Sequence, residues 1–407
     1  MKNVKKILAC ALAVIMLLPI HSAMAAQNSQ LRFTDDGGFR IMLVSDVQDI
    51  RFTSKFFLSA FNAVLDDEAP DMVILLGDQL EAWRPCMKLG DADKNAADAI
   101  RNIVTPMVQR NIPFAVVLGN HDAESGLSRE RLIELYRDYP NCLAVDEGEC
   151  MPGAGTYNLL VYDADGKTPL VNLYLIDSLD YDADGNYACV SKEQIAWCSA
   201  TAESLQAQYG KPIPAIAFQH IIVPEIYDTL NEVQKDTPGA VSRVGVGEAK
   251  YFSPESTAII SGAINEAPCP PAVNNGQFAA WEAQGDVFAA FFGHDHTNTF
   301  IIEHRGIDLV AVPGSTFCSY NDPDLRGVRM VELAADNIKA YRTRLVSFND
   351  YLDISGLDAL RYHLFATHSI PSVYKLGIIA AVVMIGAAAL ITAIIIRHKR
   401  RKRTAAQ

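Results

Sequence analysis

Short apolar runs alternate with amphipathic stretches in the part of the chain that begins at Phe39. The apolar runs predict buried strands at residues 40–45, 72–76 and 114–118. Between them, apolar residues recur near helical spacing and predict helices at residues 55–67 and about 93–110. Pro70 and Pro113 mark the helix exits. This alternation predicts a right-handed, largely parallel α/β sheet.

The second half of the chain is richer in strand patterns. Strands are expected at residues 157–162, 171–176, 215–218, 287–292, 299–303, 308–312 and 328–333. Helices are expected at residues 129–139, 192–209 and 274–284. Residues 224–272, which are rich in Pro, Gly and Ser, predict a long loop. Two sheets packed face to face, with helices outside, would bury all of these elements.

The N-terminus has the pattern of a secretory signal peptide over residues 1–26. Lys2, Lys5 and Lys6 precede an apolar run, and the small-residue segment Ala23-Met24-Ala25 follows it as a cleavage site. An uncleaved N-terminal anchor is the alternative, and it would need a longer apolar run.

The C-terminus has the pattern of a single transmembrane helix. Residues 376–396 are 21 uncharged apolar residues, and a basic stretch follows them. A bilayer-spanning helix needs about 20 such residues, and flanking Lys and Arg stay on the cytoplasmic side. A buried core helix is the alternative, but it would not need the basic stop. The expected regions are a folded domain at 38–345, a juxtamembrane stalk at 346–374, a transmembrane helix at 375–397 and a basic cytoplasmic tail at 398–407.

The formal net charge of −13 conceals a segregation of charges. Removing the three lysines of the signal peptide and the seven cations after residue 374 from the 35 Lys and Arg leaves 25, against 48 acidic residues, so the part between carries −23. Affinity for a nucleic-acid backbone comes from basic patches, so a nucleic-acid partner is excluded. An anionic substrate would have to be attracted locally, by metal ions.

Seven cysteines remain after removal of the signal peptide. In an oxidising compartment they are expected to form disulfides, and the short spacings favour Cys142–Cys150 and Cys189–Cys198 among the pairings that the sequence leaves open. One thiol must remain unpaired. The sequence contains no C-x-x-C spacing, which argues against a structural zinc-thiolate site.

Polar clusters follow five of the expected strands. The side chains in these clusters that could bind a metal or take part in catalysis are Asp46, Gln48, Asp78, Asn120, His121, His220, His294 and His296. Because α/β folds place their sites at the carboxyl ends of strands, these residues are expected to form one constellation. The turn Asp180-x-Asp182-x-Asp184-Gly185 has the start of a calcium-loop pattern, but Ser191 stands at position 12, so it is expected to be an acidic surface turn.

The order of these clusters resembles the calcineurin-like metallophosphoesterases, whose pattern is D-x-H, G-D, G-N-H-[DE], a lone His and G-H-x-H. The later stretches look most like the branch related to purple-acid-phosphatase-29-like and yeast phosphoprotein-phosphatase homologues. The resemblance covers about residues 38–345 and implies a four-layer α/β/β/α sandwich. Gln48 stands where the family usually has a His.

The resemblance implies a dinuclear site for two divalent ions, Mn, Fe, Zn or Mg. Two ions about 3.5–4 Å apart activate a water and clamp a phosphoryl group. Asp78 would bridge them. The first ion would take Asp46, Asp78 and His296, with Gln48 in the usual His position, and the second would take Asp78, Asn120, His220 and His294. His121 would act as general acid or electrostatic stabiliser, paired with Asp122.

The expected function is hydrolysis of phosphate esters, monoesters above all, on a phosphorylated small molecule or protein. The chain is expected in the cell membrane as a single-pass protein with its catalytic domain outside the cytoplasm. One alternative is a phosphodiesterase or nucleotidase with the same core. The other is a catalytically silent surface binding protein, which the departure at Gln48 suggests. Purple-type iron chemistry is disfavoured because residues 79–85 contain no Tyr.

Overall fold

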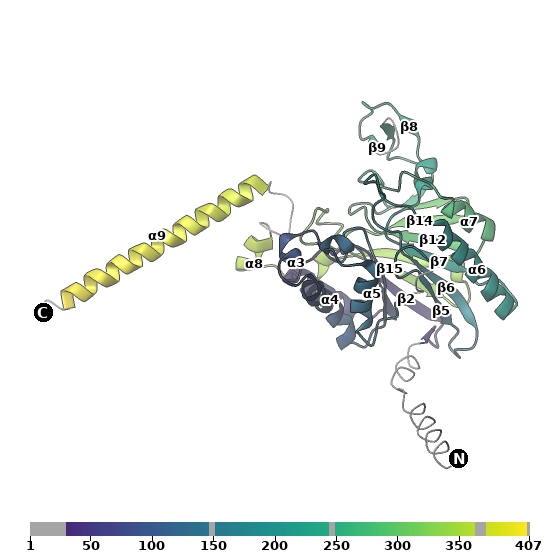
Figure 1. Ribbon diagram of the computed structural model, residues 1–407, viewed down its shortest axis with the longest axis horizontal. Coiled ribbons are helices and arrows are strands. Elements are labelled where there is room, and N and C mark those ends of the chain that lie inside the picture. The colour runs from purple at the N-terminus through teal and green to yellow at the C-terminus, as the bar shows by residue number, and fades with distance from the viewer. Residues whose placement is uncertain (1–29, 146–150, 244–248, 363–371, 405–407) are drawn as a thin grey trace, which may run out of the picture.

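Two β-sheets pack face to face with helices on their outer sides (Figure 1). The computed structural model describes residues 30–145, 151–243, 249–362 and 372–404. The predicted signal peptide and Cys150 lie outside the described residues.

The first sheet has five strands in the order β16-β15-β2-β3-β4. Its parallel centre is β2 (Gly38–Val44), β3 (Met72–Leu76) and β4 (Phe114–Val117), and β15 (Gly327–Ala334) and β16 (Arg342–Ser347) add to it antiparallel. The connections carry α2 (Lys55–Glu68), α3 (Pro85–Lys88) and α4 (Ala92–Gln109), and α5 (Arg129–Arg137) follows β4. The predicted βαβ alternation is therefore confirmed.

The second sheet has eight strands in the order β1-β5-β6-β7-β12-β14-β13-β11. They are β1 (Leu31–Arg32), β5 (Tyr157–Tyr162), β6 (Pro169–Ile176), β7 (Ala215–Gln219), β12 (Val287–Phe292), β14 (Ile307–Ala311), β13 (Ile301–His304) and β11 (Ile259–Ser261). The central strands β6, β7, β12 and β14 are parallel. On the outer face lie α6 (Lys192–Tyr209) and α7 (Gln277–Gln284), and α6 begins at a capping box formed by Ser191 and Gln194.

Alternate residues of the eight-stranded sheet serve two different cores. Leu173 and Phe218 belong to the large core shared with the five-stranded sheet. Their neighbours Tyr174 and Ala217 belong to the second core, which includes Trp281 of α7. Side chains alternate across a strand, so a sheet covered on both faces is built from continuous apolar runs.

Residues 224–272 contain more structure than the predicted loop. Strands β8 (Glu232–Val233), β10 (Lys250–Phe252) and β9 (Val241–Arg243) form a small antiparallel sheet. These strands are two or three residues long, too short for an alternating pattern to be visible in the sequence.

The folded domain continues past residue 345, into the segment predicted as a stalk. The segment contains η5 (Phe348–Tyr351) and α8 (Gly356–Arg361). Phe348 is fully buried and Tyr362 is 7% exposed, so both side chains are part of the core. Tyr362 therefore marks the last described residue that packs into the domain before α9 (Ser372–Thr404).

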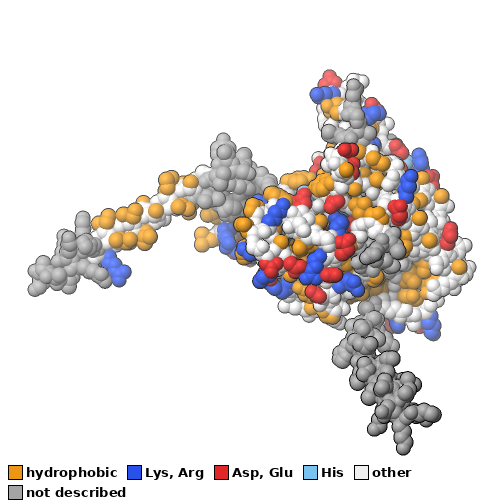
Figure 2. Space-filling view, in the orientation of Figure 1, with side chains coloured by type: hydrophobic (Ala, Val, Ile, Leu, Met, Phe, Trp, Pro, Cys, Tyr) orange, Lys and Arg blue, Asp and Glu red, His pale blue; other side chains and the backbone are white. Residues whose placement is uncertain are grey.

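Helix α9 contains one span, Ala380–Arg397, that is long and apolar enough to cross a bilayer. None of this span is buried in the structure, whereas a core helix would be mostly buried. Figure 2 shows its apolar surface, which contrasts with the mixed charges over the domain.

The predicted Cys189–Cys198 disulfide is wrong, because both residues are free thiols. Helix α6 begins between them and turns Cys198 into the second core, where burial raises the pKa of its thiol to about 12.

Candidate metal centre

The loops at the carboxyl ends of strands from both sheets meet at one site. Asp46, Asp78 and Asn120 follow β2, β3 and β4 of the five-stranded sheet, whereas His220 and His294 follow β7 and β12 of the eight-stranded sheet. All five are at most 8% exposed. The site therefore lies across the seam between the two sheets.

Asp78 lies at the centre of this site. Its Oδ1 accepts a hydrogen bond from the backbone N–H of His121 at 2.7 Å. Its Oδ2 lies 3.1 Å from Nε2 of His220. One ligand atom each from Asp78, His220 and His294 lie within 4.8 Å of one another, which is close enough to hold a single ion.

Asp46, Gln48 and His296 lie beside this group. Oδ1 of Asp46 lies 3.3 Å from Nε2 of His296, and its Oδ2 accepts from the backbone N–H of His294 at 3.0 Å. The amide nitrogen of Gln48 lies 3.2 Å from Nε2 of His296 and 3.5 Å from Oδ2 of Asp78. The structure thus turns Gln48 into the site and not away from it.

Four of the site residues have a left-handed backbone. The φ angles are +50° at Asp46, +41° at Gln48, +50° at Asp78 and +71° at His294. Non-glycine residues held in this region cost about 1–3 kcal/mol each, and such strain clusters at functional sites. With this backbone conformation, the side chains of adjacent loops point toward one centre.

Glycines in the motifs are required by close approach. A Cβ on Gly119 would lie 2.0 Å from Oδ1 of Asp78, and a Cβ on Gly293 would lie 2.0 Å from Oγ of Ser45. No side chain fits at either position, which explains why the Asn-His and His-x-His segments each begin with Gly.

Two histidines are oriented by backbone carbonyls. His220 donates from Nδ1 to the carbonyl of Leu76 at 2.9 Å, and His296 donates from Nδ1 to the carbonyl of Tyr320 at 2.6 Å. Both rings therefore direct Nε2 into the site. Metal-binding histidines are usually held in this way through the other ring nitrogen.

The charges at the site favour opposite protonation states for two neighbouring histidines. Burial opposes a charge on His220, but the carboxylates of Asp78 and Asp46 outweigh it and raise its pKa to about 10. Burial and the neighbouring His220 lower the pKa of His294 to about 3. The pKa of Asp78 stays below its usual value because the nearby histidines outweigh its burial.

The side chains fit a pair of divalent ions. Within the described residues, Oδ1 of Asn120 is buried without a hydrogen-bond partner, and Oδ1 of Asp46 and Nε2 of His220 have ion-pair contacts with His296 and Asp78 but no well-aligned hydrogen bond. Buried polar atoms are nearly always hydrogen-bonded, so oxygen and nitrogen atoms without such a bond around one centre indicate a ligand. Carboxylate, amide and imidazole groups are the donors that Mn, Fe, Zn and Mg accept.

The predicted pairing of His121 with Asp122 is wrong. Asp122 is buried and accepts backbone N–H groups of Asp78, Leu80 and Gly119 at 2.8–3.0 Å. Nδ1 of His121 instead contacts Oε2 of Glu124 at 2.9 Å. Residues three apart lie on one side of a 3₁₀ turn, and η2 (Asp122–Ser125) begins here. The spacing of three residues between His121 and Glu124 was the sequence feature that could have predicted this contact.

A tyrosine hairpin that the sequence did not reveal borders the site. Tyr181 and Tyr187 pair across the predicted acidic turn and stack at 5.7 Å. The amide of Asn120 donates to the hydroxyl of Tyr181 at 2.9 Å, and the ring of Tyr187 packs against His294 at 4.4 Å. The turn is acidic as predicted, and Ser191 caps α6, so it supplies no calcium ligand.

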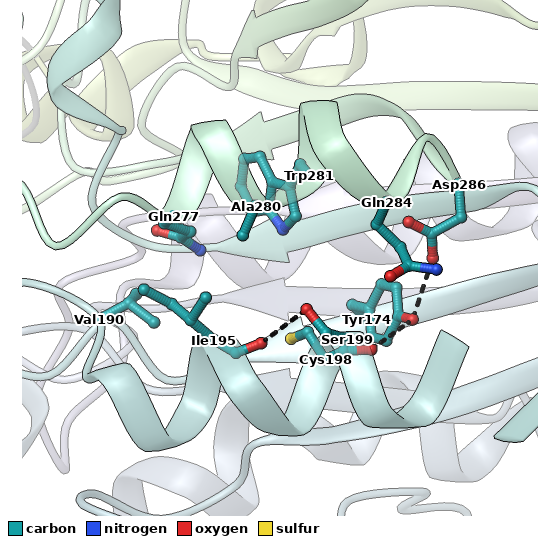
Figure 3. A pocket seen from close by; sticks show the side chains of 10 residues that line it. All are labelled: Tyr174, Val190, Ile195, Cys198, Ser199, Gln277, Ala280, Trp281, Gln284 and Asp286. Carbon is teal, nitrogen blue, oxygen red and sulfur yellow. Dashed lines mark hydrogen bonds between the residues drawn. The ribbon is translucent and has the colours of Figure 1, made fainter. Parts of the chain in front are cut away.

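A small cavity between α6 and α7 lies apart from the site (Figure 3). Tyr174 donates there to Asp286 at 3.1 Å. Asp286 precedes β12, so the cavity lies toward the amino end of the strand whose carboxyl end carries His294. Its lining is mostly apolar and offers no group of ligands.

Comparisons with known proteins identify a family. A sequence model of the family described as "Calcineurin-like phosphoesterase" matches residues 39–298. "Probable inactive purple acid phosphatase 29" of Arabidopsis thaliana is 28% identical over 76% of this chain and 79% of its own length. "Phosphatase DCR2" of Saccharomyces cerevisiae is 27% identical over 59% of this chain and 38% of its own length.

Among solved structures, a dimetal phosphatase from Danio rerio has a TM-score of 0.44 and 14% identity, and the similarity covers 76% of this chain and 99% of that protein. The family match spans well over half of the sequence and includes the loops that converge on Asp78. The predicted resemblance is thereby confirmed, and the chain belongs to the calcineurin-like phosphoesterase family.

Proposed function

We propose that the protein hydrolyses phosphate monoesters outside the cytoplasmic membrane with two divalent ions. The observation that supports the proposal is the group of buried ligand atoms of Asp78, His220 and His294, with buried atoms of Asp46 and Asn120 beside it that make no hydrogen bond. Asp46, Asp78 and His296 would hold the first ion, with Gln48 beside it. Asp78, Asn120, His220 and His294 would hold the second.

When bound, two such ions supply the Lewis acidity that activates a water and offsets charge on the phosphoryl oxygens. His121 would protonate the leaving oxygen. Burial opposes its charged form, but Asp78 and Glu124 outweigh this and raise its pKa. The acid form is thereby available near neutral pH. Glu124 also holds the ring through Nδ1, which leaves Nε2 for the substrate.

The names of the relatives differ on whether the named protein is an active enzyme. The Arabidopsis protein is named "inactive" and the yeast protein is named a phosphatase. This chain retains every side chain expected for the second ion, together with His121, and a binding protein has no need of them. The departure at Gln48 is the feature that favours the silent alternative.

A direct assay tests the proposal. The full chain, purified in detergent, is incubated with p-nitrophenyl phosphate and with bis-p-nitrophenyl phosphate across Mn, Zn, Fe, Mg and Ca. We expect faster hydrolysis of the monoester, dependent on added ion and abolished by a chelator. Faster hydrolysis of the diester would favour the phosphodiesterase, and metal binding without turnover of either would favour a silent binding protein.

We further propose that α9 anchors the chain in the cell membrane with the domain outside. The unburied apolar span and the basic residues after it support this topology. Protease added to intact cells should remove the domain and leave the tail protected. Full-length protein in the soluble cytoplasmic fraction would contradict the anchor.

The substitution Gln48→His is expected to tighten the weaker of two metal affinities and to shift its preference toward Zn. The amide nitrogen of Gln48 lies beside Asp78 and His296, and as a ligand the amide could offer only its neutral oxygen, which suits harder ions such as Mn or Mg. An imidazole favours Zn. Calorimetric titration with Mn and Zn measures both effects. Unchanged stoichiometry, affinity and preference would show that position 48 is not a ligand position.

A further inference from the structure

Four large apolar side chains are exposed together on one face of the domain. They are Phe52 at 68%, Leu89 at 70%, Leu357 at 80% and Leu360 at 56% exposed. Outside α9, ten large hydrophobic side chains of the described residues are exposed, so four of the ten belong to this group. We name the group the α8 face. Contiguous exposed apolar patches mark interaction sites, whereas scattered single residues do not.

Contacts between their neighbours show that these residues lie close together. Lys55, three residues after Phe52, forms an ion pair with Asp358 of α8. The backbone N–H of Arg51 contacts the sulfur of Met87 at 3.3 Å, in the helix that precedes Leu89. Figure 1 shows α8 beside α3 at the same end of the domain.

Helix α8 is fixed in this orientation by Tyr362. The ring of Tyr362 packs at 5.4 Å from Phe56 and 6.3 Å from Phe317, within the core. Leu357 and Leu360 are three residues apart and so lie on one side of the helix. The apolar side of α8 therefore points to solvent while its end is locked into the domain.

The short connection to the next helix limits how far this face can lie from α9. Nine residues, 363–371, connect Tyr362 to the start of α9. A chain of this length reaches at most about 35 Å. If α9 spans the bilayer, the α8 face is held beside the lipid surface at an effective concentration that no soluble partner matches.

The charges around the face suit a lipid surface. Arg51, Lys55, Lys88 and Arg361 lie within three residues of these apolar side chains in the sequence, as do Asp91, which caps α4, and Asp358, which pairs with Lys55. Cations therefore outnumber these two carboxylates around the face, in a domain that is otherwise strongly acidic. Lys and Arg beside Leu and Phe are typical of segments that lie at the headgroup boundary, where the apolar side chains insert and the cations contact phosphates.

We propose that the α8 face rests on the lipid surface of the membrane in which α9 is anchored. This inference rests on the proposed anchor, but not on the proposed hydrolysis. The domain would then be docked on the bilayer in one orientation and would not swing freely on its connecting segment.

Tryptophan quenching in nanodiscs tests the docking. The full-length variant Phe52→Trp is reconstituted at one chain per disc in lipids with or without brominated acyl chains, and its emission is compared with the wild type. We expect loss of most of the added emission in brominated lipid. The matched control Val273→Trp, at a 54% exposed position before α7, should show no quenching of its added emission.

A second variant keeps the test decisive. Leu357→Ser with Leu360→Ser, in the Phe52→Trp background, should restore the emission without changing the melting temperature. If chains with Phe52→Trp co-purify with the discs but the emission of the added indole is not quenched, the docking is overturned and the anchor remains. Chains that fail to co-purify would overturn both. If the added indole instead becomes shielded as the protein concentration rises in detergent, independently of the lipid, the face contacts a second copy of the chain and the proposal is overturned.

Discussion

Replacing Asp78 by asparagine is expected to reduce the rate of metal-dependent hydrolysis by more than about 100-fold. Loss of a residue that only hydrogen-bonds to a metal ligand typically costs up to about 100-fold, and loss of a ligand should cost more. The amide oxygen can still accept from the backbone of His121, so the loop should remain folded. What is lost is the negative charge beside Nε2 of His220, and with it the carboxylate that we propose as the bridge between two ions. The rate is measured with p-nitrophenyl phosphate at limiting metal.

Two further variants separate the role of Asp78 from a general loss of charge. His294→Ala should lower the rate to a similar degree, because it removes one of the three candidate ligand atoms grouped with Asp78 and His220. Asp98→Asn removes an equal charge from a surface carboxylate that pairs with Lys94 and Arg101, and it should leave the rate unchanged. Full activity of Asp78→Asn or His294→Ala would refute the two-metal assignment.

The substitution Asp177→Ala is expected to lower the free energy of unfolding by about 3–5 kcal/mol, the cost of leaving one partner of a buried ion pair alone. Asp177 is fully buried and accepts from Nε of Arg129 at 2.8 Å and from the backbone of Ala154 at 2.9 Å. Arg129 in turn donates to the carbonyl of Gly119 at 3.0 Å. Urea unfolding measures the change, and metal affinity should fall with it because Gly119 precedes Asn120.

Matched changes test whether burial is the cause. The pair Lys94–Asp98 is exposed at Lys94, and Lys94→Ala should cost less than about 1 kcal/mol. The double variant Arg129→Met with Asp177→Leu should recover much of the lost stability, since apolar side chains can replace a buried pair. A cost below about 1 kcal/mol for Asp177→Ala would contradict this account of the pair.

The strands and their site residues were predictable because the same apolar runs determine both. Runs such as 72–76 and 287–292 are buried on both faces, so their ends are marked sharply by the first polar residue. Parallel strands of one sheet align their carboxyl ends, so the runs are enough to place Asp46 beside Asp78 in one sheet and His220 beside His294 in the other. How the two sheets meet could not be read from the runs.

The sequence did not predict interactions that depend on backbone conformation at single residues. Asp122 and Glu124 are both acidic neighbours of His121, and only the 3₁₀ turn decides which one faces the ring. The hairpin of Tyr181 and Tyr187 was hidden in an acidic turn, because aromatic stacking across a turn leaves no periodic signal. The burial of Phe348 likewise depends on contacts far away in the chain.

The location of the site across the seam between the two sheets has a consequence for biogenesis. Asp46, Asp78 and Asn120 come from the first third of the chain, whereas His220, His294 and His296 come from later strands. Neither of these two groups forms the complete set by itself, so the ligands assemble only when the two sheets dock. An exported chain would therefore acquire its ions at the end of folding, and metal content would distinguish mature molecules from incompletely folded ones.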